Sequence, residues 1–214
     1  MNCKLVGQFV QHLEVTLDPG EHFYSERGAV IYLETGLQMD STFNGSGLGR
    51  ILGAKISGES VLILHVFNPT STQRKVVFGS KFGLLPVKMY GETMICHRGA
   101  YVASNNKMDI STKLSIAGFT GGMGFFLQKI SGHGTVFLDT MGTPIVINLE
   151  IGQTIEVDED HIIALHRISD AQMQANWSLR NLFGGEGLSM LKITGPGTVY
   201  LSPGKPSAIF TPVR

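Results

Sequence analysis

The chain has 214 residues, with 17 lysines and arginines against 17 aspartates and glutamates. Because there is no basic excess, the sequence argues against a protein held to nucleic acid by general attraction to phosphates. Hydrophobic residues make up 43% of the chain, charged residues only 16%, and glycines number 27. This composition suits many short buried strands joined by tight turns, so we predict an all-β fold.

The first residues, MNCKLVGQFVQHLEV, show no targeting signal. They lack the continuous apolar core of a signal peptide and the arginine-rich pattern of a transit peptide. No stretch of the chain reaches the roughly 18 consecutive apolar residues that a membrane helix needs. The cysteines Cys3 and Cys96 form neither a Cys-x-x-Cys pair nor a four-ligand zinc framework. We therefore expect a cytoplasmic protein with two reduced thiols.

A turn of the type Gly-Glu or Gly-Gln precedes a strand-like segment three times, at Gly20, Gly91 and Gly152. An Arg-Gly-Ala sequence follows the first two turns at the same offset and ends at Ala29 and Ala100. The copies are roughly 60 to 70 residues apart, which is too long for one coil of a solenoid and suits a small β-domain. We therefore divide the chain into three β repeats, 1–68, 69–140 and 141–214.

A glycine-rich motif also recurs. The segment GGMGFFLQKISGHGTVFL (121–138) aligns without gaps on GGEGLSMLKITGPGTVYL (184–201), with 10 of 18 positions identical. A weaker copy is SGLGRILGAKISGESVLIL (46–64). A phosphate-binding loop would open a helix, whereas these copies are followed by strand-like residues. We therefore interpret the motif as a repeated turn or bulge between strands.

The C-terminal segment LFGGEGLSMLKITGPGTVYLSP (182–203) resembles the hallmark of the family named after the yeast altered-inheritance-of-mitochondria protein, whose bacterial members were long filed as a domain of unknown function. The resemblance covers nearly the whole chain. It implies three tandem repeats, each a short double-stranded β-helix or β-sandwich related to the tryptophan-sensing RNA-binding attenuation protein. We expect them to pack around an approximate internal threefold axis. The resemblance implies no catalytic activity and no cofactor.

The histidines suggest a metal site only weakly, because no His-x-His pair occurs. The nearest local cluster is Asp158, Asp160, His161 and His166, in which the two aspartates share one strand face if the strand continues that far. We favour a solvated acidic turn. The seven histidines are His12, His22, His65, His97, His133, His161 and His166.

Nucleophilic catalysis has less support. Cys96 and His97 are neighbours on a predicted strand, so their side chains point to opposite faces and cannot form a nucleophile–base pair. We expect Cys96 in the core, and likewise Trp177. A short helix is predicted around residues 169–179. One lysine recurs in each repeat, at Lys55, Lys129 and Lys192. These lysines either form a basic ring or are ordinary solvent-facing strand residues, and we favour the second interpretation.

We predict a non-enzymatic cytoplasmic scaffold or binding protein that self-associates or binds other proteins through the glycine-rich loops. Contact of an exposed phenylalanine with a membrane surface is a further option. The alternatives are a small-ligand or RNA-binding regulator, by analogy of fold, and, with less support, a metal-dependent enzyme. No cofactor or metal is expected. The candidate interaction surface consists of Gly122, Met123, Phe125, Phe126, Gly185, Glu186 and Gly187.

Overall fold

The computed structural model describes residues 1–43, 62–113, 127–176 and 190–205. These residues form β-strands and two 3-10 helices of three residues each, so the predicted all-β fold is confirmed. The helix predicted around residues 169–179 is wrong in length, because a single 3-10 turn leads directly into a strand at Met173. No helix in the described residues is long and apolar enough to cross a bilayer.

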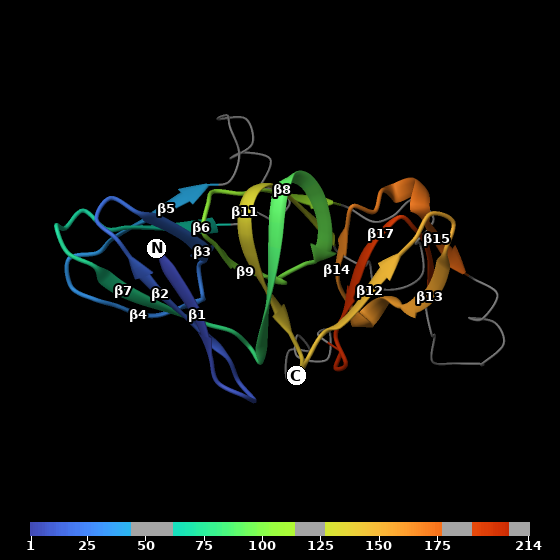
Figure 1. Ribbon diagram of the computed structural model, residues 1–214, viewed down its shortest axis with the longest axis horizontal. Helices are drawn as coiled ribbons and strands as arrows, with labels where there is room; N and C mark the ends of the chain where they lie inside the picture. The colour runs from blue at the N-terminus through green and yellow to red at the C-terminus, as the bar shows by residue number, and fades with distance from the viewer. Residues whose placement is uncertain (44–61, 114–126, 177–189, 206–214) are drawn as a thin grey trace, which may run out of the picture.

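The strands fall into three consecutive groups, which lie side by side along the long axis of the molecule (Figure 1). We call them the first, second and third units. The first unit contains β1 (Asn2–Val6), β2 (His12–Leu17), β3 (His22–Glu26), β4 (Val30–Leu33), β5 (Gln38–Phe43), β6 (Leu62–Phe67) and β7 (Arg74–Gly79). The second unit contains β8 (Gly83–His97), β9 (Tyr101–Ser104), β10 (Asp109–Lys113) and β11 (Leu127–Thr140).

The third unit has shorter strands than the second. It contains β12 (Ile145–Leu149), β13 (Thr154–Asp158), η1 (Glu159–His161), β14 (Ile162–His166), η2 (Asp170–Gln172), β15 (Met173–Asn176), β16 (Met190–Thr194) and β17 (Gly197–Leu201).

One pattern of antiparallel pairing occurs in all three units. In the first unit β2 and β4 pair with β7, while β3 and β5 pair with β6. In the third unit β12 and β14 pair with β17, while β13 and β15 pair with β16. The second unit makes the same contacts with two long strands. Strand β8 corresponds to β12 and β13 together, and β11 corresponds to β16 and β17 together.

The glycine turns sit at equivalent places in this pattern. Gly20 and Gly152 separate two strands, and Gly91 lies inside β8. All three have left-handed backbone, with φ values of 81°, 78° and 103° respectively. Glycine adopts this conformation without the steric cost that a Cβ atom brings, which explains the repeated turn found in the sequence.

Adjacent units are joined by one further strand pairing each. At the first joint β9 pairs with β3, and Ser25 lies opposite Ala103. At the second joint β14 pairs with β8, and Cys96 lies opposite Ala164. The joining strand also completes the core of the preceding unit, since Ala103 packs in the cluster of the first unit and Ala164 in that of the second.

These joints place the units in the order third, second, first within one ten-stranded sheet. In the described residues no strand of the first unit pairs with a strand of the third. The approximate threefold axis therefore stays a prediction, as does the division at residues 68 and 140. Strand β7 begins after residue 68, in the predicted second repeat, but it pairs with β2 and β4 of the first unit.

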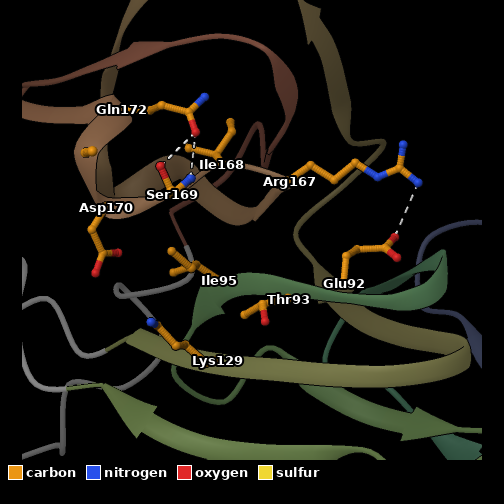
Figure 2. A pocket seen from close by; sticks show the side chains of 10 residues that line it. Glu92, Thr93, Ile95, Lys129, Arg167, Ile168, Ser169, Asp170 and Gln172 are labelled. Carbon is orange, nitrogen blue, oxygen red and sulfur yellow. Dashed lines mark hydrogen bonds and ion pairs between the residues drawn. The ribbon is translucent and has the colours of Figure 1, made fainter.

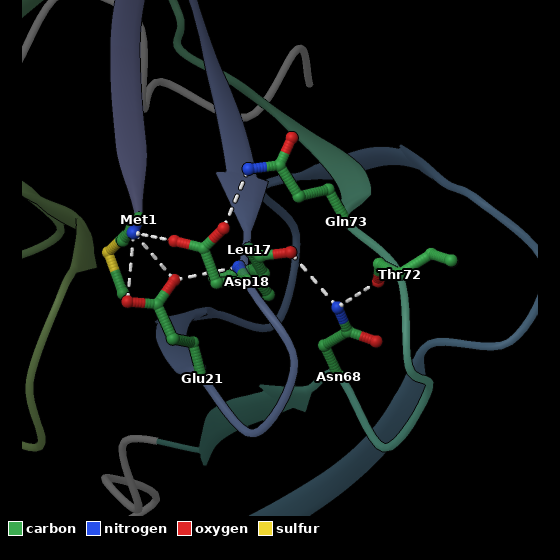
Figure 3. Close-up of polar contacts among 7 residues, drawn as sticks. All are labelled: Met1, Leu17, Asp18, Glu21, Asn68, Thr72 and Gln73. Atoms are coloured by element: carbon green, nitrogen blue, oxygen red, sulfur yellow. Dashed lines mark hydrogen bonds and ion pairs between the residues drawn. The ribbon is translucent and has the colours of Figure 1, made fainter.

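A buried asparagine organises the loop between β6 and β7 (Figure 3). The Asn68 side-chain amide donates to the carbonyls of Leu17 and Thr72, at 2.9 Å each, and its oxygen accepts from the backbone N–H of Thr70. Nearby, the Met1 ammonium lies 2.6 Å from the Asp18 carboxylate. The first unit therefore stabilises the loop between β6 and β7 with side-chain hydrogen bonds, whereas the equivalent loop of the third unit, between β16 and β17, has the sequence Gly-Pro-Gly.

Candidate functional site

A cavity of about 580 Å³ lies beside the second joint (Figure 2). It is bounded by β8, by β11 and by the segment that follows β14. Its lining residues are Glu92, Thr93, Ile95, Lys129, Arg167, Ile168, Ser169, Asp170, Ala171 and Gln172. The pocket thus combines residues of the second and third units, and the joint itself creates it.

The segment after β14 leaves the sheet through an unusual backbone conformation. Arg167 has φ of 59°, in the left-handed region that residues other than glycine adopt rarely. The next turn is held by Gln172, whose side-chain oxygen accepts from the backbone N–H and the hydroxyl of Ser169, at 2.9 Å each. This turn forms one wall of the pocket, above Ile95 in Figure 2.

An ionic network crosses the second joint at one end of the pocket. Glu92 Oε1 lies 2.6 Å from His166 Nε2 and 3.6 Å from Arg167 Nη2. Burial opposes the charge of Glu92, but hydrogen bonds from its own backbone N–H, from His166 and from the backbone N–H of Tyr90 outweigh it, and the pKa of Glu92 falls to about 2. The carboxylate is therefore ionised at neutral pH and helps to hold the two units together.

The other end of the pocket is formed by Lys129, which lies opposite Ile95 in the β8–β11 pairing. Lys129 is half-buried, and its ammonium has no hydrogen bond or ion pair with the described residues. Ile95 and Ile168 supply apolar walls, and each is at least nine-tenths buried. The pocket therefore offers a cation that no described residue pairs, beside an apolar surface, and this arrangement suits the acidic group of an amphipathic small molecule.

The predicted interaction surface lies elsewhere in the chain. Its seven residues, Gly122, Met123, Phe125, Phe126, Gly185, Glu186 and Gly187, all lie outside the described residues, and so do Lys55 and Trp177. Of the recurring lysines, Lys129 lines the pocket, whereas Lys192 lies on β16 opposite Glu156.

The acidic and histidine residues considered as a metal cluster are engaged in other contacts, and the Lys205 ammonium lies 2.8 Å from Asp158 and 3.5 Å from Asp160. The strand ends at Asp158, so the two aspartates do not share a strand face; Asp158 instead accepts from the backbone N–H of Asp160. His161 Nδ1 contacts the carbonyl of Ser202 at 2.7 Å, and His166 contacts Glu92. Among the described residues, no group of three His, Cys, Asp or Glu is placed to hold a metal ion.

Cys96 lies in the core, as predicted, with no exposed surface. Burial raises the pKa of its thiol to about 12, which keeps the sulfur protonated and unreactive. The pKa of His97 is lowered, chiefly by burial.

Sequence reasoning missed two features. The pocket brings together Glu92, Lys129 and Arg167, which are far apart in the chain, and no local motif marks them. A second missed contact joins His22 Nδ1 and His65 Nε2 at 2.7 Å, with the His65 ring stacked on Tyr24 and the His22 ring on Phe67. These pairs form across neighbouring strands, so only the register of β3 and β6 reveals them.

Comparison with known proteins agrees with the fold. The chain is 24% identical over 199 residues to an uncharacterized protein of Streptococcus pyogenes serotype M6, a match that covers 88% of this chain and 79% of that protein. An X-ray structure of a Streptococcus pyogenes protein, determined by a structural genomics consortium, superposes with a TM-score of 0.73 at 20% identity and covers 97% of this chain and 95% of the other. The family model described as "Mitochondrial biogenesis AIM24" matches residues 3–204. The chain therefore belongs to the AIM24 family.

Proposed function

We propose that this chain is a non-enzymatic binding protein whose pocket at the second joint holds a small amphipathic anion. The observation that carries the proposal is the Lys129 ammonium, which lines the pocket without a partner among the described residues. A half-buried cation beside apolar walls gains most from a ligand that supplies a negative charge and covers the apolar surface together.

Three further charged residues line the pocket, Glu92, Arg167 and Asp170, and Asp170 has a contact of its own. Glu92 is engaged by His166 and Arg167, so its negative charge is compensated at its own end of the pocket. Between the two ends lie Ile95 and Thr93 (Figure 2). An acidic group at Lys129, with a short apolar body directed along Ile95 and Ile168, would use each of these surfaces.

The first experiment is native mass spectrometry of the gently purified protein. We expect a mass excess over the chain mass, and we expect Lys129→Met to lose it. Lys192→Met is the matched control, because it removes the lysine at the equivalent place of the sequence repeat outside the pocket.

A titration with defined probes tests the ligand class whatever the protein retains on purification. Octanoate combines a carboxylate with an apolar chain, whereas 1-octanol lacks the charge and octylammonium reverses it. We expect octanoate to bind most tightly and Lys129→Met to weaken it by about tenfold, the size of one charge-assisted hydrogen bond. Equal binding of the three probes, or no binding of octanoate to the wild type, would contradict the proposal.

A further inference from the structure

The first unit exposes the strand that the other two units bury. In β9 and β14 the residues Val102, Ala103, Ile163 and Ala164 are at most 1% exposed, because each strand inserts into the preceding unit. The equivalent strand of the first unit, β4, pairs with β7 alone in the described residues. Its central residues Ile31 and Tyr32 are 60% and 48% exposed.

The third unit presents the matching edge. The strands β3 and β8 each pair with a joining strand of the next unit, whereas their equivalent β13 pairs with β16 alone in the described residues. Val157 stands five residues after Gly152, as Ser25 and Cys96 stand five residues after their turn glycines. Within the described ranges, β4 is therefore a joining strand without an acceptor, and β13 is an acceptor without a joining strand.

We propose that β4 of one copy pairs with β13 of a second copy, so that the joint between units continues between molecules and the protein associates head to tail. In the register of the internal joints, Tyr32 lies opposite Val157, as Ala103 lies opposite Ser25 and Ala164 opposite Cys96. Ile31 then enters the position of Val102 and Ile163, residues of the same β-branched type. This surface is separate from the pocket and does not depend on the proposed function.

The contact differs from the internal joints at both facing positions. Tyr32 stands where the internal joints have alanine, and Val157 stands where they have serine or cysteine. The intermolecular pairing is therefore less closely packed and is expected to be reversible. Because different surfaces of the two copies meet, the contact is heterologous and produces either a closed ring or an open chain.

Two variants that block opposite ends provide the test. Ile31→Lys with Tyr32→Lys places charge on the edge of β4, and Glu156→Pro interrupts the ladder of β13. We expect light scattering and native mass spectrometry to show concentration-dependent assemblies of the wild type and a monomer of each variant alone. An equimolar mixture should form a dimer, because one intact β4 and one intact β13 remain, and this dimer would also show that both variants are folded.

The control is Ile145→Lys with Val146→Lys on β12, an edge strand that exposes its two apolar residues to a similar degree, 51% and 50%, outside the proposed contact. It should assemble like the wild type. A second variant, Tyr32→Ala, restores the residue of the internal joints and should lower the dissociation constant.

Five results would each overturn the proposal. The wild type could stay monomeric up to about 1 mM, the concentration range of the weakest specific contacts. The Glu156→Pro variant, with circular dichroism showing it folded, could still dimerise, which would indicate that two β4 strands pair with each other. The mixture of folded variants could remain monomeric. Finally, the β12 control could abolish assembly, or Tyr32→Ala could weaken it.

Discussion

The two joints share a register but differ in the charges around them. At both joints a small buried residue, Ser25 or Cys96, lies opposite a buried alanine. Beside the first joint stands Glu26, for which burial and the nearby Asp139 outweigh the attraction of Lys81 and raise the pKa to about 7. Beside the second joint stands Glu92, with its pKa lowered to about 2.

The comparison shows which properties the two joints share and which belong to one of them. Close approach of two strands needs small residues on both sides, so the register and the alanines recur. The surrounding side chains are not constrained in this way, and the second joint combines an ionic network with the pocket. The charges of the candidate site therefore differ from those beside the first joint.

The largest expected effect comes from filling a joint. Ala103→Leu and Ala164→Leu each add three carbons at a site with no exposed surface, and overpacking of this kind costs about 3 kcal/mol. Urea unfolding of both variants would measure it, with Ile145→Leu on the exposed face of β12 as control. A loss below about 0.5 kcal/mol at both sites would mean that the joints are not closely packed.

The next effect concerns the second joint alone. Glu92→Ala removes the partner of His166, whose side chain is only 10% exposed, and loss of a charge-assisted hydrogen bond at such a site costs about 2 kcal/mol. Glu150→Ala removes an exposed glutamate and serves as the control. Equal stability of the two variants would contradict a structural role for the network.

The two glutamates should have opposite effects on the pH dependence of stability. The folded pKa of Glu92 is lowered from 4.5 to about 2, so its contribution is present above pH 4.5 and is lost as the pH falls toward 2. The folded pKa of Glu26 is raised from 4.5 to about 7, so its contribution is complete below pH 4.5 and is lost as the pH rises through 7. Urea midpoints should be measured across this pH range for both variants. Glu92→Gln should lose the decrease in stability at low pH, and Glu26→Gln should lose the decrease as the pH rises through 7. If both variants keep the wild-type profile, other groups control it.

The smallest expected effect on stability is that of Lys129→Met. The ammonium has no partner among the described residues, so its loss should change the free energy of unfolding by less than about 0.5 kcal/mol without ligand. Octanoate should then raise the melting temperature of the wild type more than that of the variant. A large destabilisation without ligand would instead assign Lys129 a structural role.

Local rules explain what could be predicted from the sequence. The turns at Gly20, Gly91 and Gly152 are visible because left-handed backbone favours one residue type. Alternation of apolar residues marks strands such as β2, in which every second residue is buried. Burial of Cys96 is expected from its residue type, because free cysteine behaves as a small hydrophobic residue. Alternation does not mark it, since Met94, Ile95 and Cys96 are all buried.

The remaining features depend on contacts between distant segments. The first copy of the glycine-rich motif, 46–64, lies largely outside the described residues. By strand pairing, the segments of the first unit that correspond to β16 and β17 are β6 and β7, which largely follow that copy. The corner between β6 and β7 uses Asn68 rather than glycine, so comparison of glycine patterns could not find it. Nor could the left-handed backbone of Arg167 be foreseen, since no residue-type preference signals it.

The insertion of each joining strand into the preceding unit also bears on how the chain folds during synthesis. The core of the second unit includes Ile163 and Ala164, which are made well after β11, the last strand of that unit. When β11 emerges from the ribosome, the second unit therefore still exposes apolar surface around Cys96. A nascent chain at this stage resembles a partly folded intermediate and would be a substrate for chaperones until β14 is translated.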